Sequence, residues 1–139
     1  MTTRTIRGRP LVAGEAAGPV LALAEPLSFW GGVDPVTGRI VEPRHPDVGR
    51  SVAGQVLAMP AVRGSSSSSS ILAELLRLGV GPAAIVLGEP DEIMVVGALA
   101  ARELYGLSCP VVLLDADAYM AVEALAAVVI DGDGLVTGA

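Results

Sequence analysis

The second half of the chain alternates between segments with the character of helices and short runs of apolar residues. Helices are predicted over residues 68–78 and 92–104, where apolar and charged side chains are interleaved. The apolar runs that follow predict strands at Ala83–Leu87, Val111–Leu114 and Ala127–Ile130. Strands alternating with helices form parallel sheets, and parallel strands buried on both faces have uniformly apolar sequences. This alternation predicts an α/β fold with two main helices.

Local signals mark the ends of these helices. Gly79 and Gly106 follow them, and glycine suits the left-handed conformation that ends many helices. Asp91 precedes the second helix and is a candidate N-cap. A shorter helix is expected over Tyr119–Ala124, before a turn at Asp131–Gly134.

The first 60 residues carry the signals of strands and turns instead. Apolar runs at Pro10–Ala13, Gly18–Leu23 and Ser51–Met59 predict strands. The segment Asp34–Gly38, DPVTG, predicts a hairpin turn, because proline presets φ and glycine supplies a positive φ. Together the two halves predict a mixed, partly parallel sheet.

Composition indicates a folded domain with an unusual core. Of the 139 residues, 52% are hydrophobic and only 3% are aromatic, so small aliphatic side chains must fill closely spaced elements. This composition excludes intrinsic disorder, and the length predicts one domain over residues 1–139. No stretch reaches the roughly 18 apolar residues of a membrane span, and no signal peptide is visible. We therefore expect a cytoplasmic protein.

The charge argues against nucleic-acid and membrane partners. The net charge is −6, and all nine cationic residues are arginines. An acidic chain without a basic cluster is a poor ligand for nucleic acid or anionic lipid. Arg4, Arg7 and Arg9 are interpreted as part of a solvated N-terminal segment.

The single cysteine and single histidine argue against a metal site made by this chain alone. Cys109 begins an apolar run, where a buried thiol behaves as a small hydrophobe. His45 lies between Arg44 and Pro46 and is interpreted as a surface turn residue. No metal ligand is predicted.

The most unusual segment is Arg63–Ser70, RGSSSSSS, between a predicted strand and a predicted helix. Amides at a helix start lack intrahelical partners and lie at the positive end of the helix dipole, so this geometry suits an anion. Two simpler interpretations stay open, a flexible linker and one or two N-capping serines. The phosphate-loop motif GxxxxGK[ST] is absent.

The second unusual segment is Phe29–Gly32, FWGG. Gly31 and Gly32 let the backbone approach another group closely, and the aromatic pair Phe29 and Trp30 could form the wall of a site or contact a partner. The alternative is a core aromatic followed by a turn. No complete catalytic set is visible, so we expect this chain to contribute part of a site.

Taken together, these segments resemble the small subunit of aconitase X enzymes. The motifs that carry the resemblance are GRPLVAGEAAGPV, LSFWGGVDPVTGRIV, SVAGQVLAMPAVRGSSSSS, GPAAIVL and VVGALAA, from about Arg7 to Val136. The resemblance implies a swivelling β/β/α domain, like the fourth domain of aconitase. It also implies a hydro-lyase that dehydrates a small hydroxy acid. The iron–sulfur cluster would lie on a larger partner subunit, so this chain would hold no cofactor and would be inactive alone.

The resemblance also implies roles in the serine run. In aconitase-like enzymes the swivelling domain supplies a catalytic serine after a glycine in a strand-to-helix loop, and Ser65 after Gly64 matches that position. Aconitase has a substrate-binding arginine two residues later, where this chain has Ser67, so no arginine is assigned to the substrate carboxylate. Val62 also departs from the glycine usual in the family. Ser65 is expected to take the substrate α-proton. The expected substrate-binding residues are Arg63, Gly64, Ser66 and Ser67.

The substrate is less constrained than the reaction. Relatives implied by the resemblance include cis-3-hydroxy-L-proline dehydratases and phosphomevalonate dehydratases. The absence of lysine and asparagine suggests a GC-rich bacterial genome, which favours hydroxyproline, with phosphomevalonate as the alternative. An interpretation of another class is a non-catalytic module that binds an anion or metabolite.

Overall fold

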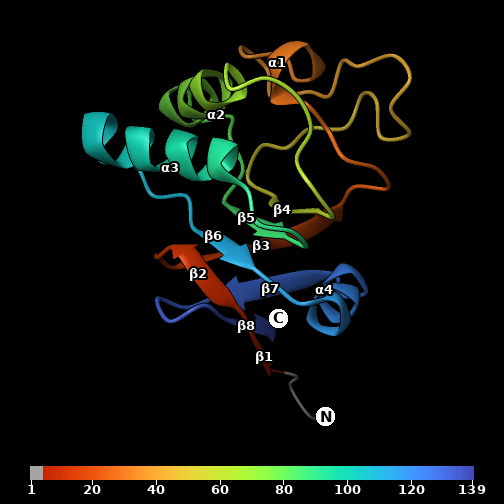
Figure 1. Ribbon diagram of the computed structural model, residues 1–139, viewed down its shortest axis with the longest axis vertical. Coiled ribbons are helices and arrows are strands. Elements are labelled where there is room, and N and C mark those ends of the chain that lie inside the picture. Colours follow the sequence, from red (N-terminus) through yellow and green to blue (C-terminus); the bar gives the residue numbers. More distant parts are fainter. Residues whose placement is uncertain (1–4) are drawn as a thin grey trace.

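The computed structural model describes residues 5–139. Its strands are β1 (Thr5–Arg7), β2 (Arg9–Val12), β3 (Ala16–Ala22), β4 (Val56–Met59), β5 (Ala84–Leu87), β6 (Val111–Leu113), β7 (Ala127–Ile130) and β8 (Leu135–Gly138). Its helices are α1 (Phe29–Gly32), α2 (Ser68–Arg77), α3 (Glu92–Tyr105) and α4 (Ala116–Glu123). Figure 1 shows α2 and α3 side by side above the sheet, whereas α4 packs against β1 and β3.

The strands form a closed ring because two segments of the chain, β1–β2 and β3, each pair with one strand along their first half and with another along their second half. The order is β1-β8-β7-β3-β4-β5-β6-β2, and only Gly8 separates β1 from β2, so the order ends on the segment where it began. β3 pairs with antiparallel β7 over its first half and with parallel β4 over its second half. The strands β3, β4, β5 and β6 are parallel and the other pairs antiparallel. The prediction of a mixed, partly parallel α/β sheet is confirmed.

Gly8 is the point at which the ring closes. Its N–H donates to the carbonyl oxygen of Gly134 at 2.9 Å. A Cβ atom at residue 8 would overlap the side chain of Val112 and lie 2.8 Å from Cδ2 of Leu114. The crossing between the two halves of the sheet therefore requires glycine.

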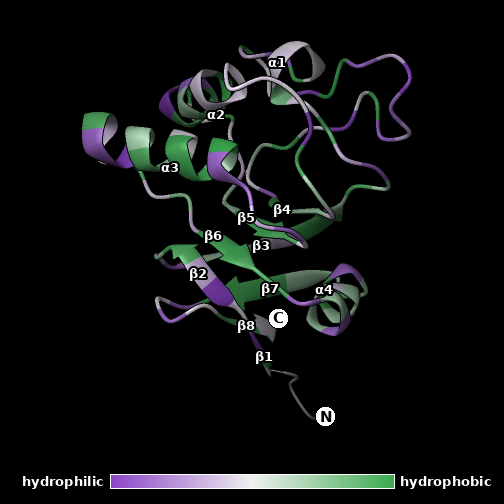
Figure 2. Ribbon diagram, viewed as in Figure 1, coloured by the Kyte–Doolittle hydropathy of each residue, from purple (hydrophilic) through white to green (hydrophobic). Residues whose placement is uncertain are grey.

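The parallel strands β4, β5 and β6 divide their side chains between two cores, because successive residues of a strand face opposite sides. Toward α2 and α3 they present Leu57, Met59, Ile85, Leu87 and Val111. Toward the interior of the ring they present Val56, Ala58, Ala84, Val86 and Val112. Figure 2 shows β6 and β7 as hydrophobic strands at the centre of the molecule. The smaller interior side chains account for a core with so few aromatic residues.

The two main helices begin and end where the sequence signals predict. Asp91 caps α3, since its carboxylate accepts a hydrogen bond from the N–H of Met94 at 2.6 Å. Gly79 and Gly106 follow α2 and α3 with φ of 75° and 67°. The hairpin turn is also confirmed, with Val33 and Ile40 bridged and the Asp34 carboxylate accepting from the N–H of Val36 at 2.8 Å. Cys109 is buried, as expected.

Two predicted elements differ from the structure. The strand predicted over Ser51–Met59 covers only Val56–Met59, because Gly54 turns the chain with φ of 70°. α4 begins at Ala116 rather than Tyr119, since the Asp115 carboxylate accepts from the N–H of Ala118 at 2.8 Å and caps the helix earlier.

The N-terminal segment is a strand rather than a solvated end. β1 pairs with β8, and Ile6 is buried in the ring core. The side chains of Arg7 and Arg9 are exposed, as expected, and Arg4 lies outside the described residues.

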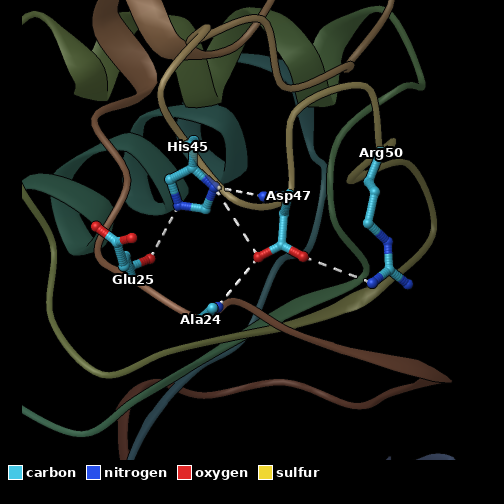
Figure 3. A network of polar contacts seen from close by, with 5 residues as sticks. All are labelled: Ala24, Glu25, His45, Asp47 and Arg50. Carbon is cyan, nitrogen blue, oxygen red and sulfur yellow. Dashed lines mark hydrogen bonds and ion pairs between the residues drawn. The ribbon is translucent and has the colours of Figure 1, made fainter.

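His45 lies in a turn, as predicted, but the expectation that it lies on the surface is wrong. Its side chain is buried and has main-chain partners on both ring nitrogens (Figure 3). Nε2 lies 3.1 Å from the carbonyl oxygen of Glu25, and Nδ1 accepts from the N–H of Asp47 at 3.0 Å. The Asp47 carboxylate in turn accepts from the N–H of Ala24 at 3.1 Å. These contacts join the segment after β3 to the long loop before β4.

Candidate active-site loop

The serine run lies at a strand-to-helix junction, as predicted. β4 ends at Met59, the loop follows, and α2 begins at Ser68. Figure 1 shows the chain rising from β4 to the start of α2, beside α1. The loop residues with exposed side chains are Arg63, Ser65, Ser66 and Ser67, with Gly64 among them.

Hydrogen bonds within the run orient Ser65. The N–H of Ser67 donates to Oγ of Ser65 at 3.1 Å, and the N–H of Ser68 donates to the Ser65 carbonyl oxygen at 2.9 Å. The next two amides bond to carbonyl oxygens three residues earlier. Among residues 5–139, the N–H groups of Ser65 and Ser66 have no acceptor. Main-chain N–H groups that are free to bind an anion therefore lie at the beginning of the run.

Two serines of the run serve the fold. Ser68 is fully buried, and its Oγ accepts from the N–H of Trp30 at 2.9 Å. The Ser69 hydroxyl donates to the carbonyl oxygen of Ile93 at 2.7 Å, which ties α2 to α3. The second half of the run is thus the first turn of a packed helix, and the run is not a flexible linker. The helical phase of Ser68 with Leu72, on the buried face of α2, was the sequence signal for this role.

The Phe29–Gly32 segment forms a short helical turn whose two aromatic residues point in different directions. Phe29 is fully buried and belongs to the core that includes α2 and α3, whereas Trp30 is 57% exposed. Gly31 has φ of 78° and Gly32 is buried. Of the aromatic pair, only Trp30 can line a site or contact a partner.

A surface hollow of about 520 Å³ adjoins this turn. It is mostly apolar, and Ile71 contributes to it from the first turn of α2. Its lining residues are Trp30, Gly31, Val33, Asp34, Pro35, Val41 and Ile71. The hollow therefore lies at the same end of α2 as the serine run.

The residues that the structure describes do not fit an iron–sulfur cluster. Within residues 5–139, no group of three or more His, Cys, Asp or Glu side chains is arranged to hold a metal. Cys109 is buried, and burial raises the pKa of its thiol to about 12, so the thiolate that a cluster needs is strongly disfavoured.

No helix within residues 5–139 has the length and apolar character needed to cross a bilayer.

The family model of the aconitase X swivel domain matches residues 5–138, nearly all of the residues described above. The chain belongs to this family. The resemblance expected from the FWGG and serine motifs is thereby confirmed.

Relatives of this swivel domain fall into two named groups. The chain is 50% identical to a cis-3-hydroxy-L-proline dehydratase from Pseudomonas aeruginosa over 106 residues, which are 76% of this chain but 18% of that protein. It is 42% identical to a phosphomevalonate dehydratase small subunit from Methanothermobacter thermautotrophicus over 93 residues, 67% of this chain and 71% of that one. The chain thus spans less than a fifth of the hydroxyproline dehydratase.

A solved structure shares the fold of this swivel domain. Aconitase X of Thermococcus kodakaraensis, in its holo form, superposes with a TM-score of 0.82 over 98% of both chains, at 33% sequence identity. The expected swivelling-domain architecture is therefore confirmed.

Proposed function

We propose that this swivel domain works as the small-subunit part of an aconitase X-type dehydratase and supplies the base of a site shared with a larger partner. The observation that carries this proposal is the exposed Ser65 at the start of α2, with a main-chain donor on its Oγ. The names of its relatives, which are dehydratases, support the reaction class. Because residues 5–139 contain no group of side chains arranged to hold a cluster, an iron–sulfur cluster belongs to the partner in this proposal.

Ser65 is proposed to take the α-proton of the substrate. A serine hydroxyl is a weak base unless its alkoxide is stabilised, and donors aimed at a developing oxyanion supply that stabilisation. The N–H of Ser67, 3.1 Å from Ser65 Oγ, is such a donor. In this proposal Ser65 reacts as the alkoxide, after its own hydroxyl proton has been lost to solvent. As the α-proton moves to the alkoxide oxygen, the carbon–carbon double bond forms and the β carbon–oxygen bond breaks. The departing hydroxide then takes that proton from the Ser65 hydroxyl and leaves as water, which restores the alkoxide.

The other exposed residues of the loop are proposed to bind the substrate anion. Arg63 lies two residues before Ser65, and Ser66 and Ser67, each with a hydroxyl group, directly follow Ser65. The main chain at Gly64 and the N–H groups of Ser65 and Ser66 complete the donor set. We propose cis-3-hydroxy-L-proline as the substrate, because identity to the hydroxyproline dehydratase is 50% against 42% for the phosphomevalonate dehydratase.

The hollow beside Trp30 is proposed to contact the larger partner. It is mostly apolar, it holds the only tryptophan of the chain, and it lies at the end of α2 that carries Ser65. Closing this hollow with a partner side chain would also bring the partner over the serine run. Gly31 lines the hollow beside Trp30, whereas Phe29 and Gly32 are buried and are not among its lining residues.

The test is reconstitution of the dehydratase from this chain and a larger aconitase X subunit. Dehydration of cis-3-hydroxy-L-proline and of mevalonate 5-phosphate is measured for the complex and for each subunit alone. We expect activity on hydroxyproline only in the complex, and a fall in kcat of about 10²–10⁴-fold for Ser65→Ala. Ser66→Ala and Ser67→Ala should mainly raise KM. Ser70→Ala, at an exposed position in the first turn of α2, is the matched control.

Normal kcat in Ser65→Ala would remove Ser65 from the mechanism. Failure to form any complex, with ligand binding by the isolated chain, would instead support a non-catalytic anion-binding module.

A further inference from the structure

A short segment before α2 in the chain runs alongside the serine loop and contacts it at three successive places. Leu27 and Val62 form a parallel bridge ahead of the loop. Ser28 packs against Gly64, and the N–H of Trp30 donates to Oγ of Ser68 at 2.9 Å. These contacts lie on both sides of Ser65. Residues 27–30 therefore hold both ends of the loop that carries it.

The contact before Ser65 requires glycine. Gly64 has φ of 104°, a conformation that other residues rarely adopt. A Cβ atom there would overlap the Ser28 hydroxyl and lie 2.7 Å from the Ser28 Cβ. The Ser28 hydroxyl is itself oriented, because it donates to the carbonyl oxygen of Trp30 at 3.0 Å. The main chain of the loop thus packs closely against Ser28 at Gly64, immediately before Ser65.

The contact after Ser65 passes through one buried side chain. Ser68 has no exposed surface, and its Oγ holds the N–H of Trp30. The main-chain N–H of Ser68 donates to the carbonyl oxygen of Ser65 at 2.9 Å. Ser68 therefore links the main chain of Trp30, 38 residues earlier in the sequence, to the main chain of Ser65 through two hydrogen bonds.

We propose that Ser68 is a positioning residue, which sets the place of Ser65 by anchoring the start of α2 to Trp30. The proposal rests on the proposed function, in which Ser65 is the base. Ser68 is buried and does not contact substrate, so its effect reaches the reaction only through the position of Ser65. A displacement of about 1 Å in a reacting group can cost about 10²-fold in rate.

The chain offers a matched control in Ser69. Its hydroxyl also makes one part-buried hydrogen bond, to the carbonyl oxygen of Ile93, but this bond joins α2 to α3 rather than to residues 27–30. Loss of either hydroxyl should therefore cost similar stability. Only loss of the Ser68 hydroxyl should change catalysis.

The experiment measures kcat, KM and amide hydrogen exchange for Ser65→Ala, Ser68→Ala and Ser69→Ala in the reconstituted complex, with cis-3-hydroxy-L-proline as substrate. We expect Ser68→Ala to lower kcat about 10–100-fold with KM changed less than about twofold, and to remove exchange protection from the Trp30 amide. Ser69→Ala should keep kcat within about twofold. Ser68→Cys, which keeps the shape of the side chain but is a weak acceptor, gives the same comparison if Ser68→Ala does not fold.

The outcomes separate this inference from the proposed function. Loss of activity in Ser65→Ala with normal kcat in Ser68→Ala, despite lost protection at Trp30, would overturn the positioning role and leave the base in place. Equal kcat losses in Ser68→Ala and Ser69→Ala would also overturn it, since they would reflect stability alone. Normal kcat in Ser65→Ala would overturn both.

Discussion

The main-chain N–H of Asp47 donates to Nδ1 of His45 at 3.0 Å, and this contact determines the tautomer of the buried ring (Figure 3). An N–H group can only donate, so Nδ1 carries no proton. Nε2 lies 3.1 Å from the carbonyl oxygen of Glu25, which can only accept, so Nε2 carries it. His45 is thus the neutral Nε2–H tautomer. Ring nitrogen-15 chemical shifts should report a protonated Nε2 and an unprotonated Nδ1.

Replacing this histidine should destabilise the protein. His45→Ala leaves the part-buried N–H of Asp47 and the carbonyl of Glu25 without these partners, so we expect the free energy of unfolding to fall by about 1–3 kcal/mol. Arg50→Ala is the control, because the Arg50 side chain is 61% exposed and lies 3.6 Å from the Asp47 carboxylate. Its effect should stay below about 1 kcal/mol. Equal losses for the two variants in urea unfolding would contradict a structural role for the ring.

Gly8→Ala should disrupt closure of the strand ring. The added Cβ would overlap Val112 and crowd Leu114 and the Gly134 carbonyl oxygen, so we expect a loss of about 1–3 kcal/mol in urea unfolding. Gly132→Ala is the matched control, since a Cβ there meets nothing within 4 Å. It should change stability by less than about 0.5 kcal/mol. A tolerated Gly8→Ala would mean that β1 and β2 can move apart at little cost.

Tyr119→Phe should maintain or increase stability. The Tyr119 hydroxyl is buried and has no hydrogen-bond partner among residues 5–139. Burial, and then the charge of Glu123, raise its pKa, so the hydroxyl stays neutral at physiological pH. Phenylalanine removes the unsatisfied oxygen and keeps the ring, which should raise the free energy of unfolding by up to about 1 kcal/mol. A clear loss of stability would show that an ordered water molecule satisfies the hydroxyl.

Cys109 should make stability fall at alkaline pH. Burial raises the pKa of the folded thiol from 9.0 to about 12. Above about pH 9 the unfolded thiol loses its proton while the folded one keeps it, so the unfolded state is favoured until about pH 12. The difference between the native protein and Cys109→Ala should shrink by about 1.4 kcal/mol per pH unit in that range. A constant difference would mean that the thiol titrates normally in the folded state.

Trp30→Ala should weaken assembly without harming the fold. The side chain is 57% exposed, so its loss costs little internal packing, but it removes the largest apolar group of the proposed contact surface. We expect the Kd for the larger subunit to rise at least about tenfold, as for a central aromatic interface residue. Met120→Ala, equally exposed on α4, is the control. Unchanged binding and kcat in Trp30→Ala would remove this hollow from the interface.

Sequence patterns predicted the helices because their determinants are local. The carboxylate of Asp91 caps an amide three residues away, and Gly79 and Gly106 act on the residues beside them. Apolar runs located the central strands for a related reason, since burial on both faces requires apolar residues at every position. The FWGG and serine motifs, which carried the family resemblance, are also continuous in sequence.

Other features depend on partners that are distant in sequence. The strand at Thr5–Arg7 exists because it pairs with residues 135–137. His45 is buried where it contacts the carbonyl oxygen of Glu25, a residue 20 positions earlier in the sequence. Ser68 differs from the other serines because it binds the N–H of Trp30, which is 38 positions earlier. The sequence by itself determined the boundaries of the two main helices, α2 and α3, the apolar strands and the motif that contains Ser65. Only the tertiary structure decided which serine binds Trp30, because that choice depends on how α1 and α2 pack together.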